Sequence, residues 1–233
     1  MNKVYAVGVG PGSPEFITKR VEAILRNSDV IIGYKYTLNT IKDLISGKEV
    51  YEITMKTQED VYQKVQKSLG EKILVIPFTG DVNFSESEVV DRLIEIFGDV
   101  HVVPGISSIQ IAVSLAKVPL DKSKVITMHI STSIEREKIE LQKALLDGFN
   151  VVLVPRPWPK DPSKHFMPSE VAFYLKKNGF DTKKLKVHVF ENLTTDKEAV
   201  FVGMVDDLEK KEFSDLSVMV FDQSKLNSYI NFN

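Results

Sequence analysis

Residues 7–14 read Val-Gly-Val-Gly-Pro-Gly-Ser-Pro, between an apolar segment at 4–9 and a segment at 17–28. Apolar side chains in 17–28 recur at helical spacing, which predicts an amphipathic helix. A strand, a glycine-rich turn and a helix in this order are typical of the beginning of an α/β fold. The glycines predict a tight loop whose backbone a ligand can approach closely.

The rest of the first half continues this alternation of strands and helices. Strands are predicted at 4–9, 30–32, 49–53, 73–78 and 100–103, and helices at 17–28, 38–45, 61–69, 86–97 and from 107 onward. Such alternation predicts parallel strands with helices on both faces, and ligands then bind beyond the carboxyl ends of the strands. The turns at 8–12, 79–84 and 104–108 all follow strands, so we expect them to converge on one ligand site.

The second half predicts a different, mixed domain. Strands are predicted at 124–130, 150–154, 185–191, 198–205 and 216–221, and helices at 134–147 and 169–177. The link at 192–197 is too short for a helical crossover, so the strands that flank it should form an antiparallel hairpin. A proline at 119 follows a long helix, so the predicted domains are 1–117 and 118–225, with a tail at 226–233.

The glycine-rich turn has two well-known alternatives, which the sequence argues against. Its glycines are spaced G-x-G-x-G, not G-x-G-x-x-G, and Pro11 and Pro14 lack the N–H groups that a pyrophosphate site needs. Asp29 precedes the second strand, whereas a ribose-binding acidic residue should follow it. No phosphate-binding loop of the G-x-x-x-x-G-K-[ST] type is present.

Composition bounds the class of protein. The 233 residues are 43% hydrophobic and 27% charged with a net charge of -2, which is typical of a globular protein and not of a nucleic-acid binder. The chain has no cysteine, which excludes disulfides and thiolate nucleophiles and fits a cytoplasmic location. We expect no membrane span, because no apolar run approaches about 20 residues. The histidines lack metal-ligand spacing, so no metal site is predicted.

Four motifs together resemble the tetrapyrrole methylases. Residues 7–18 resemble that family's opening signature, Gly80-Asp81 lies in the place of its Gly-Asp-Pro loop, and 104–108 and 191–194 resemble its third loop and C-terminal hairpin. The resemblance implies an α/β protein of two domains with a ligand cleft between them. It also implies an enzyme that transfers a methyl group from S-adenosylmethionine to a tetrapyrrole.

The resemblance also implies a reaction. Residues 106–110 and the hairpin are most similar to members that methylate carbon 5 of cobalt-precorrin-7 in cobalamin biosynthesis, whereas 33–35 resembles members that methylate carbon 17. Alternatives are a diphthine synthase, whose acceptor is a protein histidine, and a non-catalytic binder on the same fold. By analogy we expect a homodimer and a separate partner enzyme for methylation at carbon 15 and decarboxylation.

The resemblance assigns methyl-donor contacts to both domains. The positions that match are Val9, Gly10, Asp81, Phe84, Ser107 and Ser108 in the first domain and Val154, Asn192 and Ser217 in the second. The Asp81 carboxylate could also attract a cationic donor, or it could be a turn residue, and the serines could be a helix N-cap. Val82 stands where the family has proline, which makes this loop the clearest departure from the pattern.

The tetrapyrrole carries several carboxylates, so its binding site should be basic. The substrate-binding candidates are Pro11, Gly12, Lys35, Arg156 and Lys160. Segment 155–165 is proline-rich and basic, which suggests a lid over the substrate or else a solvated loop. No catalytic residue is assigned, because the sulfonium donor is already activated and the enzyme has mainly to align it with the acceptor carbon.

Overall fold

The computed structural model describes residues 3–84, 87–130, 132–157 and 165–223. The chain folds as two compact units, Met1–Ser108 and Ile109–Asn233, and each unit is described by itself. Along the chain, the boundary between the units falls at the beginning of helix α5 (Ser108–Ala116). The boundary predicted from Pro119 lies just beyond the end of that helix. In the described residues no helix is both long and apolar enough to cross a bilayer.

The first unit contains a five-stranded sheet in which all strands run parallel. Its order is β3-β2-β4-β1-β5, so β1 lies between β4 and β5. The strands are β1 (Lys3–Gly8), β2 (Val30–Tyr34), β3 (Glu49–Ile53), β4 (Ile73–Phe78) and β5 (Val100–Val103). The helices are α1 (Lys19–Arg26), α2 (Lys35–Thr40), α3 (Gln58–Ser68) and α4 (Ser87–Phe97). The predicted α/β class is confirmed.

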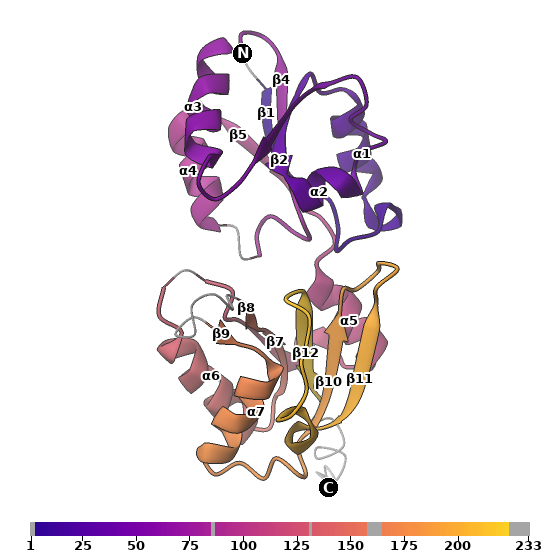
Figure 1. Ribbon diagram of the computed structural model, residues 1–233, viewed down its shortest axis with the longest axis vertical. Helices are drawn as coiled ribbons and strands as arrows, with labels where there is room; N and C mark the ends of the chain where they lie inside the picture. Colours follow the sequence, from indigo (N-terminus) through magenta and orange to yellow (C-terminus); the bar gives the residue numbers. More distant parts are fainter. Residues whose placement is uncertain (1–2, 85–86, 131, 158–164, 224–233) are drawn as a thin grey trace, which may run out of the picture. The chain divides into compact units, whose positions relative to one another are not determined.

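Helices cover both faces of this sheet, as Figure 1 shows, with α1 and α2 on one side and α3 and α4 on the other. Successive side chains of a strand point to opposite faces. In β4, Leu74 and Ile76 therefore pack with residues of α3, whereas Val75 packs with residues of α1 and α2. Because both faces of the inner strands are buried, β2 and β4 read as continuous apolar runs and not as alternating ones.

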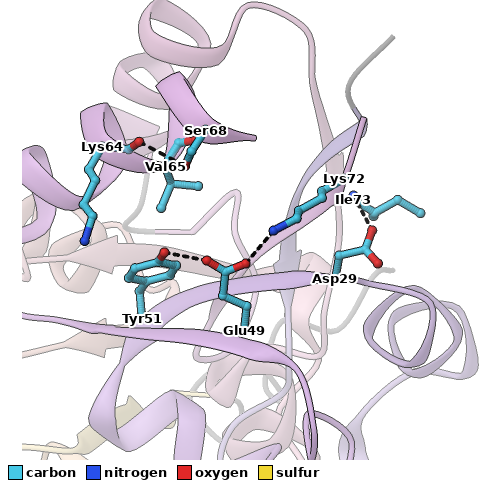
Figure 2. A network of polar contacts seen from close by, with 8 residues as sticks. All are labelled: Asp29, Glu49, Tyr51, Lys64, Val65, Ser68, Lys72 and Ile73. Carbon is cyan, nitrogen blue, oxygen red and sulfur yellow. Dashed lines mark hydrogen bonds and ion pairs between the residues drawn. The ribbon is translucent and has the colours of Figure 1, made fainter. Parts of the chain in front are cut away.

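A network of polar side chains lies at the amino ends of these strands (Figure 2). Glu49 accepts hydrogen bonds from Lys72 at 2.7 Å and from the Tyr51 hydroxyl at 2.6 Å. The bond to Lys72, and then that to Tyr51, lowers the pKa of Glu49. Asp29 Oδ2 accepts the Ile73 backbone N–H at 2.8 Å, which joins β4 to the turn before β2. This network fixes the sheet edge opposite the predicted site.

The second unit contains a mixed five-stranded sheet in the order β11-β10-β12-β7-β6. Only β6 and β7 pair in parallel, and β10 forms antiparallel pairs with both β11 and β12. The strands are β6 (Ser123–Thr127), β7 (Asn150–Val154), β10 (Lys186–Glu191), β11 (Ala199–Met204) and β12 (Ser217–Phe221). The β10–β11 pair is the hairpin expected from the short link at 192–197.

Two helices cover one face of this second sheet, α6 (Glu135–Leu146) and α7 (Pro168–Lys177) (Figure 1). Buried Leu141 and Leu175 from these helices share a cluster with Leu153 and Phe221 from the sheet. A short antiparallel pair, β8 (Arg156–Pro157) and β9 (His165–Phe166), is an addition to the predicted elements. Two-residue strands rich in proline have no alternation that a sequence pattern could detect.

Candidate functional site

The carboxyl ends of three adjacent strands bring the predicted turns together. Because β1 lies between β4 and β5, the turns that follow these strands share one edge of the first sheet. Gly10 and Gly80 form an antiparallel bridge, with Gly80 N–H donating to Gly10 O at 2.7 Å. The Val9 N–H donates to Phe78 O at 2.9 Å, so the turn after β1 continues alongside β4. The predicted convergence of the three turns is therefore present in the first unit.

Gly8 and Gly105 allow the backbones of these turns to approach each other and Gly80 closely. A Cβ added to Gly8 would lie 2.5 Å from Gly80 O and 2.7 Å from Gly105 N. A Cβ added to Gly105 would lie 2.4 Å from both Gly8 O and Gly80 O. All of these neighbours are backbone atoms, which cannot rotate away as a side chain would. We call Gly8, Gly80 and Gly105 the glycine junction.

The turn after β4 keeps a defined shape although it lacks the family's proline. Asn83 N–H donates to Asp81 Oδ1 at 2.8 Å, and Phe84 N–H donates to Asp81 O at 3.1 Å. Val82, which replaces the proline, is fully buried in the core beside α3 and α4. Hydrogen bonds and side-chain burial thus fix the turn where a proline ring would otherwise restrict it.

Asp81 also links this turn to the next one. Its Oδ2 accepts the Gly105 N–H at 2.8 Å, so one carboxylate bonds to backbone in two turns. Ser107 is buried close to Gly80, and Ser108 is the first residue of α5. Pro11 is buried and Gly12 is half-buried in the turn after β1. These predicted residues lie in, or directly after, the three turns that meet at the glycine junction.

The second unit brings its own predicted donor residues to one edge of its sheet. Ser217 pairs with Glu191 across β10 and β12, and the Asn192 N–H donates to Leu216 O at 2.8 Å. Val154 ends β7, the other neighbour of β12. The Ser217 side chain is buried, and its hydroxyl has no hydrogen-bond partner within the described residues.

The basic candidates of segment 155–165 divide between described and undescribed residues. Arg156 is only 3% exposed, so its guanidinium does not extend into solvent. It lies in β8, opposite Phe166. Lys160 lies outside the described residues, so the lid stays a prediction. His129 lies near Arg156, and the atoms packed around the ring, followed by the Arg156 charge, lower the pKa of His129.

The hairpin loop after β10 contains two residues with left-handed backbone. Asn192 has φ of 48° and Thr194 has φ of 66°, a conformation that a β-branched residue rarely adopts. The Asn192 carbonyl accepts the Thr195 hydroxyl at 2.7 Å, and Asn192 Oδ1 accepts the Ser214 hydroxyl at 3.0 Å. These bonds hold the loop in a strained shape, as is frequent at ligand sites.

We expect the substitution Thr194→Gly to stabilise the protein by about 1 kcal/mol, because glycine adopts this conformation without steric cost. The Thr194 N–H, which donates to Glu198 Oε2 at 2.6 Å, is kept in the variant. Urea unfolding of both proteins measures the difference. Matched stabilities for the two proteins would mean that Thr194 carries no backbone strain.

A patch of exposed side chains that sequence reasoning mostly missed adjoins the glycine junction. It consists of Lys35, Tyr36, Met55 and Lys56, which directly follow β2 and β3, and we call it the carboxyl-edge patch. Met55 is 77% exposed and Tyr36 is 41% exposed, and both lysines are exposed. Only Lys35 was predicted. The clustering of lysine and large apolar residues after two neighbouring strands is the signal that could have identified the others.

Hydrogen bonds connect this patch to the turn after β4. The Tyr34 hydroxyl donates to Gln58 Oε1 at 2.7 Å and lies 3.2 Å from Met55 Sδ. The hydroxyls of Thr37 in α2 and Thr79, next to Gly80, are 3.0 Å apart. The segment after β2 is thus tied to the turn after β4, and the patch and the glycine junction lie at the same carboxyl edge of the first sheet.

Within the described residues, the side chains of Lys35 and Lys56 form no ion pair and no hydrogen bond with other groups. Lys72, at the opposite edge, is by contrast paired with Glu49. No three His, Cys, Asp or Glu side chains in the described part of the chain are grouped so that they could hold a metal ion. The candidate site contains backbone, hydroxyl, apolar and cationic groups and the carboxylate of Asp81.

Comparisons with known proteins place this geometry in a family. The family model for Tetrapyrrole (Corrin/Porphyrin) Methylases matches residues 3–209. The chain is 26% identical to a probable cobalt-precorrin-7 C(5)-methyltransferase of Methanocaldococcus jannaschii, over 94% of this chain and 97% of that protein. It is 24% identical to a probable cobalt-factor III C(17)-methyltransferase of the same organism, over 98% of this chain and 94% of that protein.

Solved structures share the fold. The methyltransferase CobJ superposes with a TM-score of 0.78 at 17% identity and covers 95% of this chain, with 94% of CobJ matched. The cobalt precorrin-4 methyltransferase CbiF superposes with a TM-score of 0.73 at 21% identity, over 94% of each chain. These neighbours support the α/β architecture with one parallel and one mixed sheet.

Proposed function

Because the chain belongs to the tetrapyrrole methylase family, we propose that it methylates carbon 5 of cobalt-precorrin-7 with S-adenosylmethionine as the donor. The chain is a methyltransferase of the cobalamin-biosynthesis group, in which its relatives are named for C(5) and C(17) methylation. The observation that carries the proposal is the meeting of the three predicted turns at the glycine junction.

S-adenosylmethionine supplies an activated methyl group, which an attacking carbon displaces from sulfur. The protein therefore needs no nucleophile of its own, and its contribution is to hold the two reactants in line, which is worth about 7–11 kcal/mol in favourable cases. In this proposal the backbone of Val9 and Gly10, the turn at 81–84 and the serines at 107 and 108 hold the donor. Because the glycine junction is packed backbone against backbone, it provides a rigid surface for this purpose.

The second unit supplies further polar groups in this proposal. The buried Ser217 hydroxyl, which lacks a hydrogen-bond partner within the described residues, suits a polar group of the donor. Asn192 and Val154 lie at the same edge of that sheet. Hydrogen bonds fix the Asn192 loop before any ligand binds, so donor binding would not have to order it.

The carboxyl-edge patch suits the methyl acceptor. A tetrapyrrole has an apolar macrocycle with carboxylates on its rim, and the patch combines two apolar side chains, Tyr36 and Met55, with two cationic ones, Lys35 and Lys56. Partial burial raises the pKa of the Tyr36 hydroxyl, and a phenol is neutral at physiological pH even at its ordinary pKa. The patch lies beside the turn after β4, which we propose as the donor side of the site.

The choice of carbon rests on sequence similarity. The C(5) relative matches at 26% identity and the C(17) relative at 24%. The resemblance of residues 106–110 to C(5) members favours carbon 5, and the resemblance of 33–35 to C(17) members makes carbon 17 the second candidate.

We expect the purified protein to bind S-adenosylmethionine at micromolar concentrations in calorimetry. Given methyl-labelled donor and cobalt-precorrin-7, it should form a product whose label NMR locates on carbon 5. If the protein instead labels carbon 17 of cobalt-factor III, the acceptor for which the C(17) relative is named, the second candidate is favoured. Absence of donor binding at high micromolar concentration would contradict the methyltransferase proposal and favour a binder that keeps only the fold.

A further inference from the structure

Both oxygens of the Asp81 carboxylate bond to backbone N–H groups. Its Oδ1 accepts the Asn83 N–H at 2.8 Å and its Oδ2 accepts the Gly105 N–H at 2.8 Å. Asn83 belongs to the same turn as Asp81, whereas Gly105 belongs to the turn after β5. One side chain therefore both shapes its own turn and holds the neighbouring turn against it.

The hydrogen bond from Gly105 to Asp81 lies where the backbones of the glycine junction are packed most closely. No side chain fits at position 105, because an added Cβ would lie 2.4 Å from the carbonyl oxygens of Gly8 and Gly80. A hydrogen bond to an ionised carboxylate is about twice as strong as a neutral one, and Asp81 provides it.

Two roles for Asp81 in donor binding can be separated. As a bare charge near solvent it would attract the cationic sulfonium, by about 1 kcal/mol at 4 Å in water. As a partner of Gly105 it would fix the shape of the donor-binding turns and act equally on any ligand that they hold. The geometry favours the second role, because each carboxylate oxygen already accepts a backbone N–H.

We infer that Asp81 is a positioning residue: it holds Gly105 in the glycine junction and so shapes the donor site, and its charge does not select the sulfonium. This inference rests on the proposed function. It predicts that loss of Asp81 weakens S-adenosylmethionine, which is cationic, and S-adenosylhomocysteine, which is neutral, by the same factor.

Calorimetry of the full chain with both ligands tests this. For Asp81→Ala we expect both affinities to fall about 10-fold or more, the usual effect of losing a hydrogen bond to a charged group. Asp81→Asn should restore part of both affinities, because the amide oxygen can still accept the Gly105 N–H. Amide hydrogen exchange should be faster at Gly105 in Asp81→Ala than in the wild type, without any ligand.

Asp29→Ala is the matched control. Asp29 also accepts a backbone N–H at 2.8 Å, that of Ile73, but at the opposite edge of the same sheet (Figure 2). We expect this variant to lose thermal stability and to keep both affinities. Equal loss of affinity in Asp29→Ala would reduce Asp81 to a general stabilising residue and overturn the inference.

Three other results of the same measurements would also contradict the inference. Selective loss of S-adenosylmethionine in Asp81→Asn, with S-adenosylhomocysteine unchanged, would show that the charge acts on the sulfonium and overturn the inference. Unchanged affinities in Asp81→Ala would overturn it as well. Wild-type protein that binds neither ligand would refute the proposed function itself, and the inference with it.

Discussion

Gly105→Ala should weaken binding of S-adenosylmethionine and should lower the rate of methyl transfer about 100-fold or more, which is what a misplacement of about 1 Å can cost. The added methyl group would lie 2.4 Å from the carbonyl oxygens of Gly8 and Gly80. Carbon and oxygen cannot approach so closely, so the turn after β5 must shift away. Calorimetry with the donor measures the first effect, and turnover of methyl-labelled donor measures the second.

The shift cannot be absorbed locally, because every neighbour is constrained. Gly8 ends β1, which is paired on both sides with β4 and β5. Gly80 is bridged to Gly10 and has φ of 76°, which only glycine adopts readily. We therefore also expect Gly105→Ala to lower the free energy of unfolding by about 1–3 kcal/mol, as overpacking does. Urea unfolding measures this loss.

Gly70→Ala separates the effect on the site from a general effect on stability. Gly70 lies between α3 and β4 with φ of 56°, and an added Cβ there would have no atom within 4 Å. This control should lose about 1 kcal/mol through backbone strain alone and should bind the donor as the wild type does. Donor binding by Gly105→Ala at wild-type affinity would show that the glycine junction is not part of the donor site.

The sequence predicts most of the first unit because both faces of its sheet are buried. An apolar run such as 73–78, which is short and lies between Gly70 and Gly80, indicates a buried strand, and β4 has these bounds. The convergence of turns at Gly8, Gly80 and Gly105 followed from parallel topology alone. Their contact distances could not be predicted, because they depend on the register of β1 with both neighbouring strands.

Other features depend on tertiary contacts that no local pattern records. The bond from Gly105 to Asp81 joins residues 24 positions apart, and the sequence favoured a charge role or a turn role for this side chain. Arg156 was expected in a basic, solvent-facing loop, yet it is buried. Most of the carboxyl-edge patch was missed because methionine and tyrosine are usually buried at least in part. Only the fold shows that Met55 and Tyr36 are exposed.

The double substitution Lys35→Glu and Lys56→Glu should weaken tetrapyrrole binding about 1,000-fold at low salt and leave donor binding unchanged. Each reversal replaces an attraction to a substrate carboxylate by a repulsion, worth about 1 kcal/mol each way at 4 Å in water and more where solvent is excluded. Both lysines are exposed and form no ion pair within the described residues. Their loss should therefore cost the fold little.

Lys3→Glu with Lys67→Glu is the matched control, because it changes the net charge by the same amount. Lys3 begins β1 and Lys67 lies in the last turn of α3, both at the amino edge of the sheet. Fluorescence quenching by the tetrapyrrole, titrated at two salt concentrations, should show weakened and less salt-dependent binding for the carboxyl-edge variant alone. Equal weakening in both variants would mean that the substrate senses only overall charge, and normal binding in both would place the macrocycle away from β2 and β3. Because the donor affinity of each variant is measured in parallel, a defect confined to the tetrapyrrole assigns the patch to the acceptor side of the reaction.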